Sequence, residues 1–390
     1  MGVLRLAWRY VAYQRLKTAL LVASLALTVF LPLAVRALVN GYSERLLARA
    51  RATPLAAGAR GSRYDLILHA LYFRGAVPRA MPLRDVKALE AQGLGAAIPL
   101  HARFKAQGFP VVGTSLEYFE FRGLRPAAGR LPLRLGDCVA GAEAARALGL
   151  RPDDRLLTDP ENVLDLAGAY PLRMRVTGIL APNASPDDRA IFADLKTVWL
   201  IQGLGHGHQD VVEDGDPGVI LKREGGTVVA NAALPTCVEV TDANLASFHF
   251  HGDPEAFPVS AALLVPPDEK SGVLLRGRYE KHETVQVLPP EAVVEDLLGL
   301  VLRVKRFFDA NFALVALAMA LLLALVVSLS LRLRARERET LYKLGCSRGT
   351  VFGMLAGELL LVAAMSLALV ALLAAAGAAF QDDLMRMLLP

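Results

Sequence analysis

Four of the seven histidines occur as two His-x-His pairs, and each pair is followed two residues later by an aspartate. In a β-strand, residues i and i+2 project from the same face, so both imidazoles of one pair can reach one ion. Neutral imidazole is a favoured ligand of zinc, copper, nickel and iron. The pattern predicts a metal site suited to Zn²⁺, although the neighbouring glycines are also typical of polar turns. The candidate ligands are His206, His208, His249, His251, Asp210 and Asp253.

Motifs that would indicate hydrolase activity or nucleotide binding are missing from the sequence. There is no H-E-x-x-H zinc-protease motif, and Ser185 and Ser247 lack the G-x-S-x-G context of a serine hydrolase. No G-x-x-x-x-G-K-[ST] loop is present to bind nucleotide phosphates. We therefore expect no enzyme activity and no directly bound cofactor other than the metal.

Three apolar segments indicate that the chain is anchored in a membrane. The composition is 54% hydrophobic and only 21% charged, with a mean hydropathy of +0.38. Thr18–Val35 and Phe312–Leu331 carry no charge, and Val351–Phe380 carries only Glu358. Each segment is long enough to cross a bilayer as a helix. The first is also longer than the 7–15 apolar residues of a cleaved signal peptide, which favours a retained anchor.

Basic residues beside the apolar segments indicate the orientation. Residues 1–17 carry four basic and no acidic side chains, and residues 332–350 carry six basic and two acidic ones. Lys and Arg accumulate on the cytoplasmic side of membrane proteins. We therefore expect both segments in the cytoplasm of a bacterial cell, in a multi-pass protein of the inner membrane. Because the net charge of +5 is concentrated beside membrane lipid, nucleic acid is not an expected partner.

The predicted fold is an α-helical membrane protein with three transmembrane helices and a large extracytoplasmic α+β domain on helical stalks. Within that domain we expect strands at 64–73, 110–114, 137–141, 171–180, 236–240, 246–251 and 259–265. Helices are expected at 82–93, 142–150 and 193–204, with a stalk helix at 289–310. The predicted parts are a basic amphipathic helix (1–17), a transmembrane helix (18–38), the extracytoplasmic domain (39–310), a second transmembrane helix (311–331), a cytoplasmic loop (332–350), a third transmembrane helix (351–380) and an extracytoplasmic tail (381–390).

The three cysteines contribute little. Cys346 falls in the cytoplasmic loop, where thiols stay reduced. Cys138 and Cys237 both lie in expected extracytoplasmic strands, where a disulfide is chemically permitted, but two separate buried thiols are the more common arrangement.

The loop after the second apolar segment carries the most specific pattern. Residues 332–358 read RLRARERETLYKLGCSRGTVFGMLAGE, which predicts two helices separated by a glycine. Such a basic amphipathic segment can simply lie on anionic headgroups. The pattern, however, also resembles the corresponding segment of the MacB/FtsX family of ABC-transporter permeases, of the FtsX/LolC type without a fused ATPase. In that resemblance the segment is a coupling helix, formed here by Glu337, Glu339, Leu341, Leu344, Gly345 and Ser347.

Two extracytoplasmic stretches, 122–157 and 172–199, are similar to segments of the same family. The resemblance implies a permease subunit that forms a homodimer or heterodimer and is driven by a separate cytoplasmic ATPase, which binds the ATP. It favours a structural or coupling role for Glu358 over proton transfer. Family members usually have four spans, whereas three are predicted here.

Three functions remain open at this point. The first is a permease subunit that exports or extracts a substrate that the sequence does not identify. The second is a mechanotransmitter that moves no solute and regulates an extracytoplasmic partner, such as a cell-wall hydrolase. The third is a membrane-anchored metal-binding protein.

Overall fold

The computed structural model describes residues 2–160, 171–207, 220–224, 227–230, 238–333 and 335–388. The chain forms two compact units. The helical unit comprises Met1–Leu46 and Leu298–Pro390, and the α/β unit comprises Leu47–Leu297. Among the described residues, three helices are long and apolar enough to cross a membrane. The predicted fold class, three membrane-type helices with a large mixed α/β domain, is therefore confirmed.

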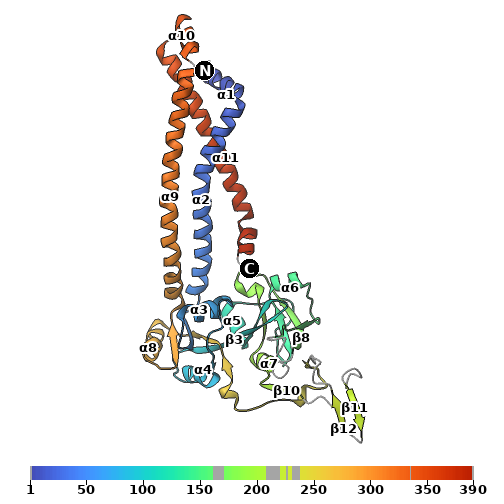
Figure 1. Ribbon diagram of the computed structural model, residues 1–390. Coiled ribbons are helices and arrows are strands. Elements are labelled where there is room, and N and C mark those ends of the chain that lie inside the picture. The colour runs from blue at the N-terminus through green and yellow to red at the C-terminus, as the bar shows by residue number, and fades with distance from the viewer. Residues whose placement is uncertain are drawn as a thin grey trace. The chain divides into compact units, whose positions relative to one another are not determined.

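In the part of the helical unit that the structure describes, long helices make up nearly all of the chain (Figure 1). Helix α1 packs on α11, where Ala7 is fully buried and an added Cβ at Gly357 would lie 3.3 Å from the Ala7 side chain. The hydroxyl of Ser366 donates to the carbonyl of Val22 at 3.4 Å and so joins α11 to α2. These small and hydroxyl side chains allow the close approach that membrane-type helices use. The helices are α1 (Gly2–Tyr13), α2 (Arg15–Arg51), α9 (Pro290–Leu333), α10 (Ala335–Lys343) and α11 (Arg348–Leu388).

The predicted stalks are continuous with the membrane-type helices. Helix α2 runs from Arg15 to Arg51 with Pro32 inside it, and α9 runs from Pro290 to Leu333. At a rise of 1.5 Å per residue they are about 55 and 66 Å long. Each helix thus begins in one unit and ends in the other.

A single mixed sheet organises the α/β unit. Its main path is β13-β8-β6-β9-β4-β3-β16-β1-β17, and β5 and β7 also pair with β8. Helix α2 leads directly into β1, and β17 leads directly into α9, so both stalks join neighbouring strands at one edge. The strands are β1 (Leu55–Ala59), β3 (Ala96–Ala106), β4 (Phe109–Thr114), β5 (Pro126–Gly129), β6 (Asp137–Ala140), β7 (Arg155–Leu157), β8 (Leu172–Leu180), β9 (Ile191–Asp194), β13 (Val238–Glu239), β16 (Ala261–Val265) and β17 (Val285–Leu288).

Two apolar clusters form the core of this unit. One surrounds β1, β16 and β17 and includes Trp199 and Phe257. The other surrounds β4, β6, β8 and β9 and includes Phe104 and Met174. The helices that cover them are α3 (Arg63–Tyr72), α4 (Leu83–Glu90), α5 (Leu116–Arg122), α6 (Ala142–Leu148), α7 (Leu195–Ile201) and α8 (Glu269–Tyr279). Cys138 lies in the second cluster as a free thiol, and burial raises its pKa above the usual range. Cys237 lies outside the described residues.

The strand predicted at 64–73 is wrong, because this segment forms α3. Ser62 caps the helix by accepting a hydrogen bond from the backbone N–H of Asp65 at 3.2 Å. Leu66 and Ala70 then share one buried helical face. The residues YDLILHALYF contain both two-residue and four-residue spacings of apolar side chains, so tertiary burial selects the helix. The helix predicted at 193–204 is shorter, since its first residues complete β9.

Within the described ranges of the α/β unit, three small two-stranded ribbons accompany the main sheet. The pairs are β10 (Gly205–Gly207) with β14 (Phe248–Phe250), β11 (Ile220–Glu224) with β12 (Thr227–Ala230), and β15 (Pro258–Val259) with β2 (Met81–Pro82). The first ribbon holds two of the predicted ligand residues, His206 and His249, and a third, His251, directly follows β14.

Candidate functional site

The β10–β14 ribbon brings histidines from the two His-x-His pairs together. The strands are antiparallel, and His206 lies directly opposite His249. His251 follows the end of β14, where its backbone N–H donates to the carbonyl of Leu204 at 3.0 Å and extends the ladder. Since His249 and His251 are two residues apart in extended chain, their side chains project from one face.

The alternation of residue types fixes which face carries the histidines. Phe248 and Phe250 lie on the opposite face of β14, where each packs against one of the two apolar clusters. They need the glycines of β10: an added Cβ at Gly205 would lie 2.7 Å from the Phe250 ring, and one at Gly207 would lie 2.8 Å from the Phe248 ring. A one-residue slip would expose both aromatic rings. The phenylalanines therefore set the register that turns the imidazoles outward.

The three imidazoles form a compact cluster. One potential ligand nitrogen from each of His206, His249 and His251 lies within 4.8 Å of the others. The ring centroids are 4.9 Å apart for His206 and His249, and 4.7 Å apart for both other pairs. His206 and His251 are exposed, and His249 is half-buried.

Of the remaining predicted ligands, Asp253 is the one that the structure describes, and it does not belong to this cluster. The carboxylate of Asp253 accepts a hydrogen bond from the backbone N–H of Glu255 at 2.9 Å and caps a short 3₁₀ turn. His208 and Asp210 lie outside the described residues. The structure therefore brings together three of the six candidates.

The predicted coupling segment has the expected helix–glycine–helix form. Helix α10 contains Glu337 and Glu339, and Glu339 pairs with Lys343 at 2.9 Å one turn later. Gly345 has a φ of +88° and ends the helix, where the N–H of Cys346 donates to the carbonyl of Leu341 at 3.0 Å. Helices commonly end in this way at a glycine, because a residue with a Cβ atom rarely adopts a positive φ.

The next helix begins immediately after that glycine. The hydroxyl of Ser347 accepts a hydrogen bond from the N–H of Thr350 at 3.2 Å and caps α11. Leu341 is half-buried, whereas Leu344 is 76% exposed. Within the helical unit, the segment thus presents an apolar side chain beside its charges.

A buried ion pair holds the end of α2 inside the α/β unit. The guanidinium of Arg49 donates to both carboxylate oxygens of Asp187, each at 2.8 Å, and to the hydroxyl of Tyr118 at 3.0 Å. The Tyr118 hydroxyl donates to Asp187 at 2.6 Å, and the Arg49 Nε donates to the carbonyl of Leu71. The side chains of Arg49 and Asp187 are only 8% and 1% exposed. Bidentate pairs of this kind are geometrically specific.

The electrostatics of this network follow from burial and the guanidinium. Burial alone would raise the pKa of Asp187, but the charge and hydrogen bonds of Arg49, the hydrogen bond from Tyr118 and the charge of Arg122 together hold that pKa below its usual range. Burial, together with the nearby carboxylate, raises the pKa of Tyr118. The pair is therefore ionised at neutral pH, with the phenol protonated. Sequence reasoning missed this site, because no local signal links an arginine at the end of a stalk to an aspartate in a distant turn.

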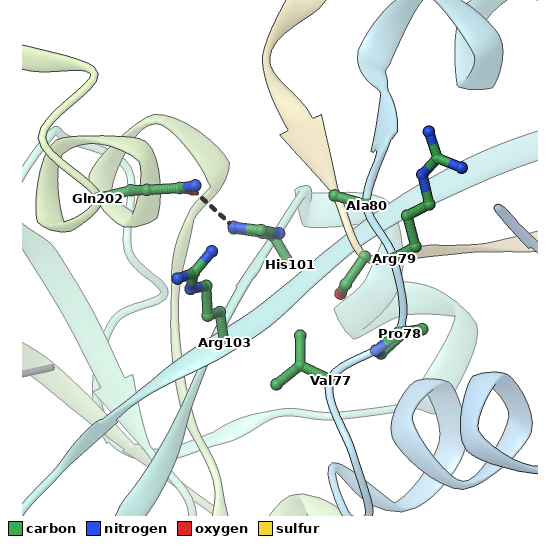
Figure 2. Close-up of a pocket in the computed structure, with 8 residues that line it drawn as sticks. Val77, Pro78, Arg79, Ala80, His101, Arg103 and Gln202 are labelled. Atoms are coloured by element: carbon green, nitrogen blue, oxygen red, sulfur yellow. Dashed lines mark hydrogen bonds between the residues drawn. The ribbon is translucent and has the colours of Figure 1, made fainter.

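A cavity of about 380 Å³ opens beside β3 in the same unit (Figure 2). The Nε2 of His101 pairs with the side-chain oxygen of Gln202 at 2.9 Å, and among the described residues its buried Nδ1 has no hydrogen-bond partner. Burial lowers the pKa of His101 to about 4. Burial, with a smaller effect from His101, lowers the pKa of neighbouring His69 to about 4 as well. The lining residues are Val77, Pro78, Arg79, Ala80, His101, Arg103, Gln202 and Ser260.

Comparisons with known proteins return only distant structural similarity. No protein-family model matches the chain, and no curated protein sequence is detectably similar to it. The periplasmic region of MacB from Actinobacillus actinomycetemcomitans aligns with a TM-score of 0.34 and 12% identity, over 65% of this chain and 97% of that one. The extracellular domain of the noncanonic ABC-type transporter YknZ from Gram-positive bacteria aligns with a TM-score of 0.31 and 9% identity, over 60% and 98%. At these values neither similarity establishes the function of this chain.

Proposed function

We propose that this chain is the permease subunit of an ABC system of the MacB/FtsX type. A separate cytoplasmic ATPase hydrolyses ATP, a second permease subunit completes the membrane part, and the extracytoplasmic α/β unit moves in response. The observation that carries the proposal is the course of α2. This one helix contains a membrane-type segment and ends in a buried ion pair within the α/β unit.

A mechanical relay needs stiff connections with firmly held ends. A helix supplies stiffness through its ladder of i→i−4 backbone hydrogen bonds. Helix α9 has no proline after its first residue, Pro290, whereas α2 contains Pro32, which has no backbone N–H and so leaves one of these bonds unmade. The Arg49–Asp187 pair fixes the end of α2 by two parallel hydrogen bonds. Near its start, α9 buries Val294 and Leu298, so apolar packing holds the second connection.

The relay also needs a surface on which the ATPase can act. The segment from α10 to the start of α11 resembles the coupling helix of the family, and it exposes Tyr342 and Leu344 among charged residues. An apolar side chain exposed on a charged helix can gain free energy by docking into a partner. This supports Leu341 and Leu344 as the anchors of that contact.

The proposal is tested by separating coupling from folding. Full-length chain is purified from detergent together with the ATPase that accompanies it, and ATP hydrolysis is measured with and without the chain. We expect the double substitution Leu341→Asp/Leu344→Asp to abolish stimulation and co-purification. Placing two carboxylates in a packed contact costs several kcal/mol, which is enough to lower affinity by more than about 100-fold.

The matched control is Val273→Asp/Leu274→Asp on α8. These two side chains are also adjacent, apolar and exposed, at 58% and 42%, but they lie in the α/β unit. We expect the control to retain stimulation. Full stimulation by the loop variant, or an equal loss in the control, would contradict the proposed coupling role.

A further inference from the structure

We propose that His206, His249 and His251 form a binding site for a divalent transition-metal ion, with Zn²⁺ as the expected occupant. The inference goes beyond the proposed permease function, because the relay requires no metal. It rests on the cluster geometry and on the packing that holds the ribbon in place.

The positions of the nitrogens suit a tetrahedral ion after a small adjustment. Zinc–nitrogen bonds of about 2.0–2.1 Å separate two tetrahedral ligands by roughly 3.4 Å. The three candidate nitrogens already lie within 4.8 Å of one another. The difference can be taken up by rotation of the imidazoles of His206 and His251, since both are exposed. No strand has to move.

The surroundings of His249 favour a defined ligand atom. Its Nδ1 lies 3.3 Å from the backbone carbonyl of Ser247. A donor hydrogen bond from Nδ1 to that carbonyl places the proton there and leaves Nε2 as the metal ligand. Metal-binding histidines commonly have their second nitrogen oriented by such a carbonyl.

The ligand set narrows the choice of metal. Three imidazoles suit zinc, copper, nickel and cobalt and do not suit calcium or magnesium, which prefer oxygen. Three protein ligands leave the fourth position of a tetrahedral ion for water or for an exogenous group. Because two of the ligands are exposed, we expect the ion to exchange with solution.

The ribbon also explains how a bound ion would act on the domain. Phe248 packs against one apolar cluster and Phe250 against the other. An ion that cross-links His206 of β10 to His249 of β14 would therefore tighten a ribbon that contacts both halves of the core. We expect metal binding to stabilise the α/β unit against unfolding.

The test uses full-length chain purified in detergent through a tag without histidines and stripped with a chelator. Zn²⁺ is titrated by calorimetry, and Co²⁺ is titrated while visible absorption is recorded. We expect one ion per chain with micromolar or tighter affinity, and a tetrahedral Co²⁺ spectrum. His206→Ala and His251→Ala should each weaken binding by about tenfold or more, since loss even of an outer-shell partner costs 10- to 100-fold.

His282→Ala is the matched control, because this exposed histidine lies in the same unit and outside the cluster. We expect it to bind Zn²⁺ like the unsubstituted chain. Absent or millimolar binding by the unsubstituted chain would overturn the proposal, as would an octahedral Co²⁺ spectrum. Equal weakening in the control would do the same. All of these measurements are made without the ATPase, so the metal site and the coupling role can fail separately.

Discussion

Arg49→Met should destabilise the α/β unit strongly while leaving α2 helical. Methionine keeps an unbranched apolar stem and a good helix propensity, so the change removes mainly the guanidinium. Asp187 then loses its counter-charge while remaining 1% exposed, and Tyr118 loses a hydrogen-bond partner.

The magnitude follows from the burial of the pair. Removing one partner of a buried ion pair costs about 3–5 kcal/mol, because the remaining charge is left without compensation. For a domain of this size, that corresponds to a fall in the melting midpoint of roughly 10 °C. Replacing Asp187 by Asn in the same chain removes the unpaired charge, so the double variant should be more stable than Arg49→Met alone.

The pH dependence provides an internal check. Without Arg49, burial is opposed only by the smaller effects of the Tyr118 hydrogen bond and the Arg122 charge, so the pKa of Asp187 in the folded variant should rise above the unfolded value. A raised folded pKa adds stability as the pH falls through it. The loss of stability caused by Arg49→Met should therefore be largest at neutral pH and become smaller toward pH 5. In the unsubstituted protein the pKa is lowered, so the pair contributes fully at neutral pH and is lost only in strong acid.

The assay uses the two tryptophans of the chain. Trp199 is buried in the α/β unit, where its indole N–H donates to the carbonyl of Pro258 at 2.8 Å. Trp8 lies in α1, so Trp8→Phe leaves Trp199 as the only tryptophan reporter. Thermal unfolding is followed by its fluorescence in detergent. A midpoint within about 2 °C of the parent chain, or no recovery with Asp187→Asn, would refute this account of the anchor.

Two further predictions concern the histidines. His69 and His101 have folded pKa values near 4, below the unfolded value of about 6.5. The free energy of unfolding should therefore be greatest above pH 6.5 and fall toward pH 4, by at most about 3 kcal/mol for each histidine. His101→Gln should remove the contribution of His101 to this pH dependence, measured by Trp199 fluorescence during thermal unfolding, and an unchanged pH dependence would contradict the lowered pKa of His101. Gly205→Ala should weaken Zn²⁺ binding because the new Cβ would lie 2.8 Å from the carbonyl of His249, whereas Gly277→Ala, with no atom within 4 Å, should leave it unchanged. Undiminished zinc affinity in Gly205→Ala would argue against the role of the ribbon.

The sequence correctly predicted those features that depend on the spacing of residues within a single helix or strand. The three apolar segments, the glycine at the end of α10 and the common face of His249 and His251 each follow from spacing along one element. Helix α3 was mispredicted because its apolar spacing is compatible with both periods, and burial by the rest of the domain decides between them.

Pairings between distant residues could not be predicted. Opposition of His206 to His249 depends on the register of two short strands, which the phenylalanines set through core packing. The partner of Arg49 lies 138 residues away in sequence. A stalk arginine near the end of an apolar helix is a weak signal, since most such residues simply remain in water.

The attachment of both stalks to one edge of the sheet has a kinematic consequence. Eight strand spacings separate β17 from β13 along the main path, which is about 38 Å at 4.8 Å each. Strand β3 contributes residues to both apolar clusters and so joins the two halves of the sheet, with one register irregularity between His101 and Phe104. If the sheet turned as one body, a rotation of about 10° at the stalk edge would carry the opposite edge through roughly 7 Å. Under the proposed function, small angular changes in α2 and α9 would then give a large displacement at β13, and a spin label at this edge should record the largest movement.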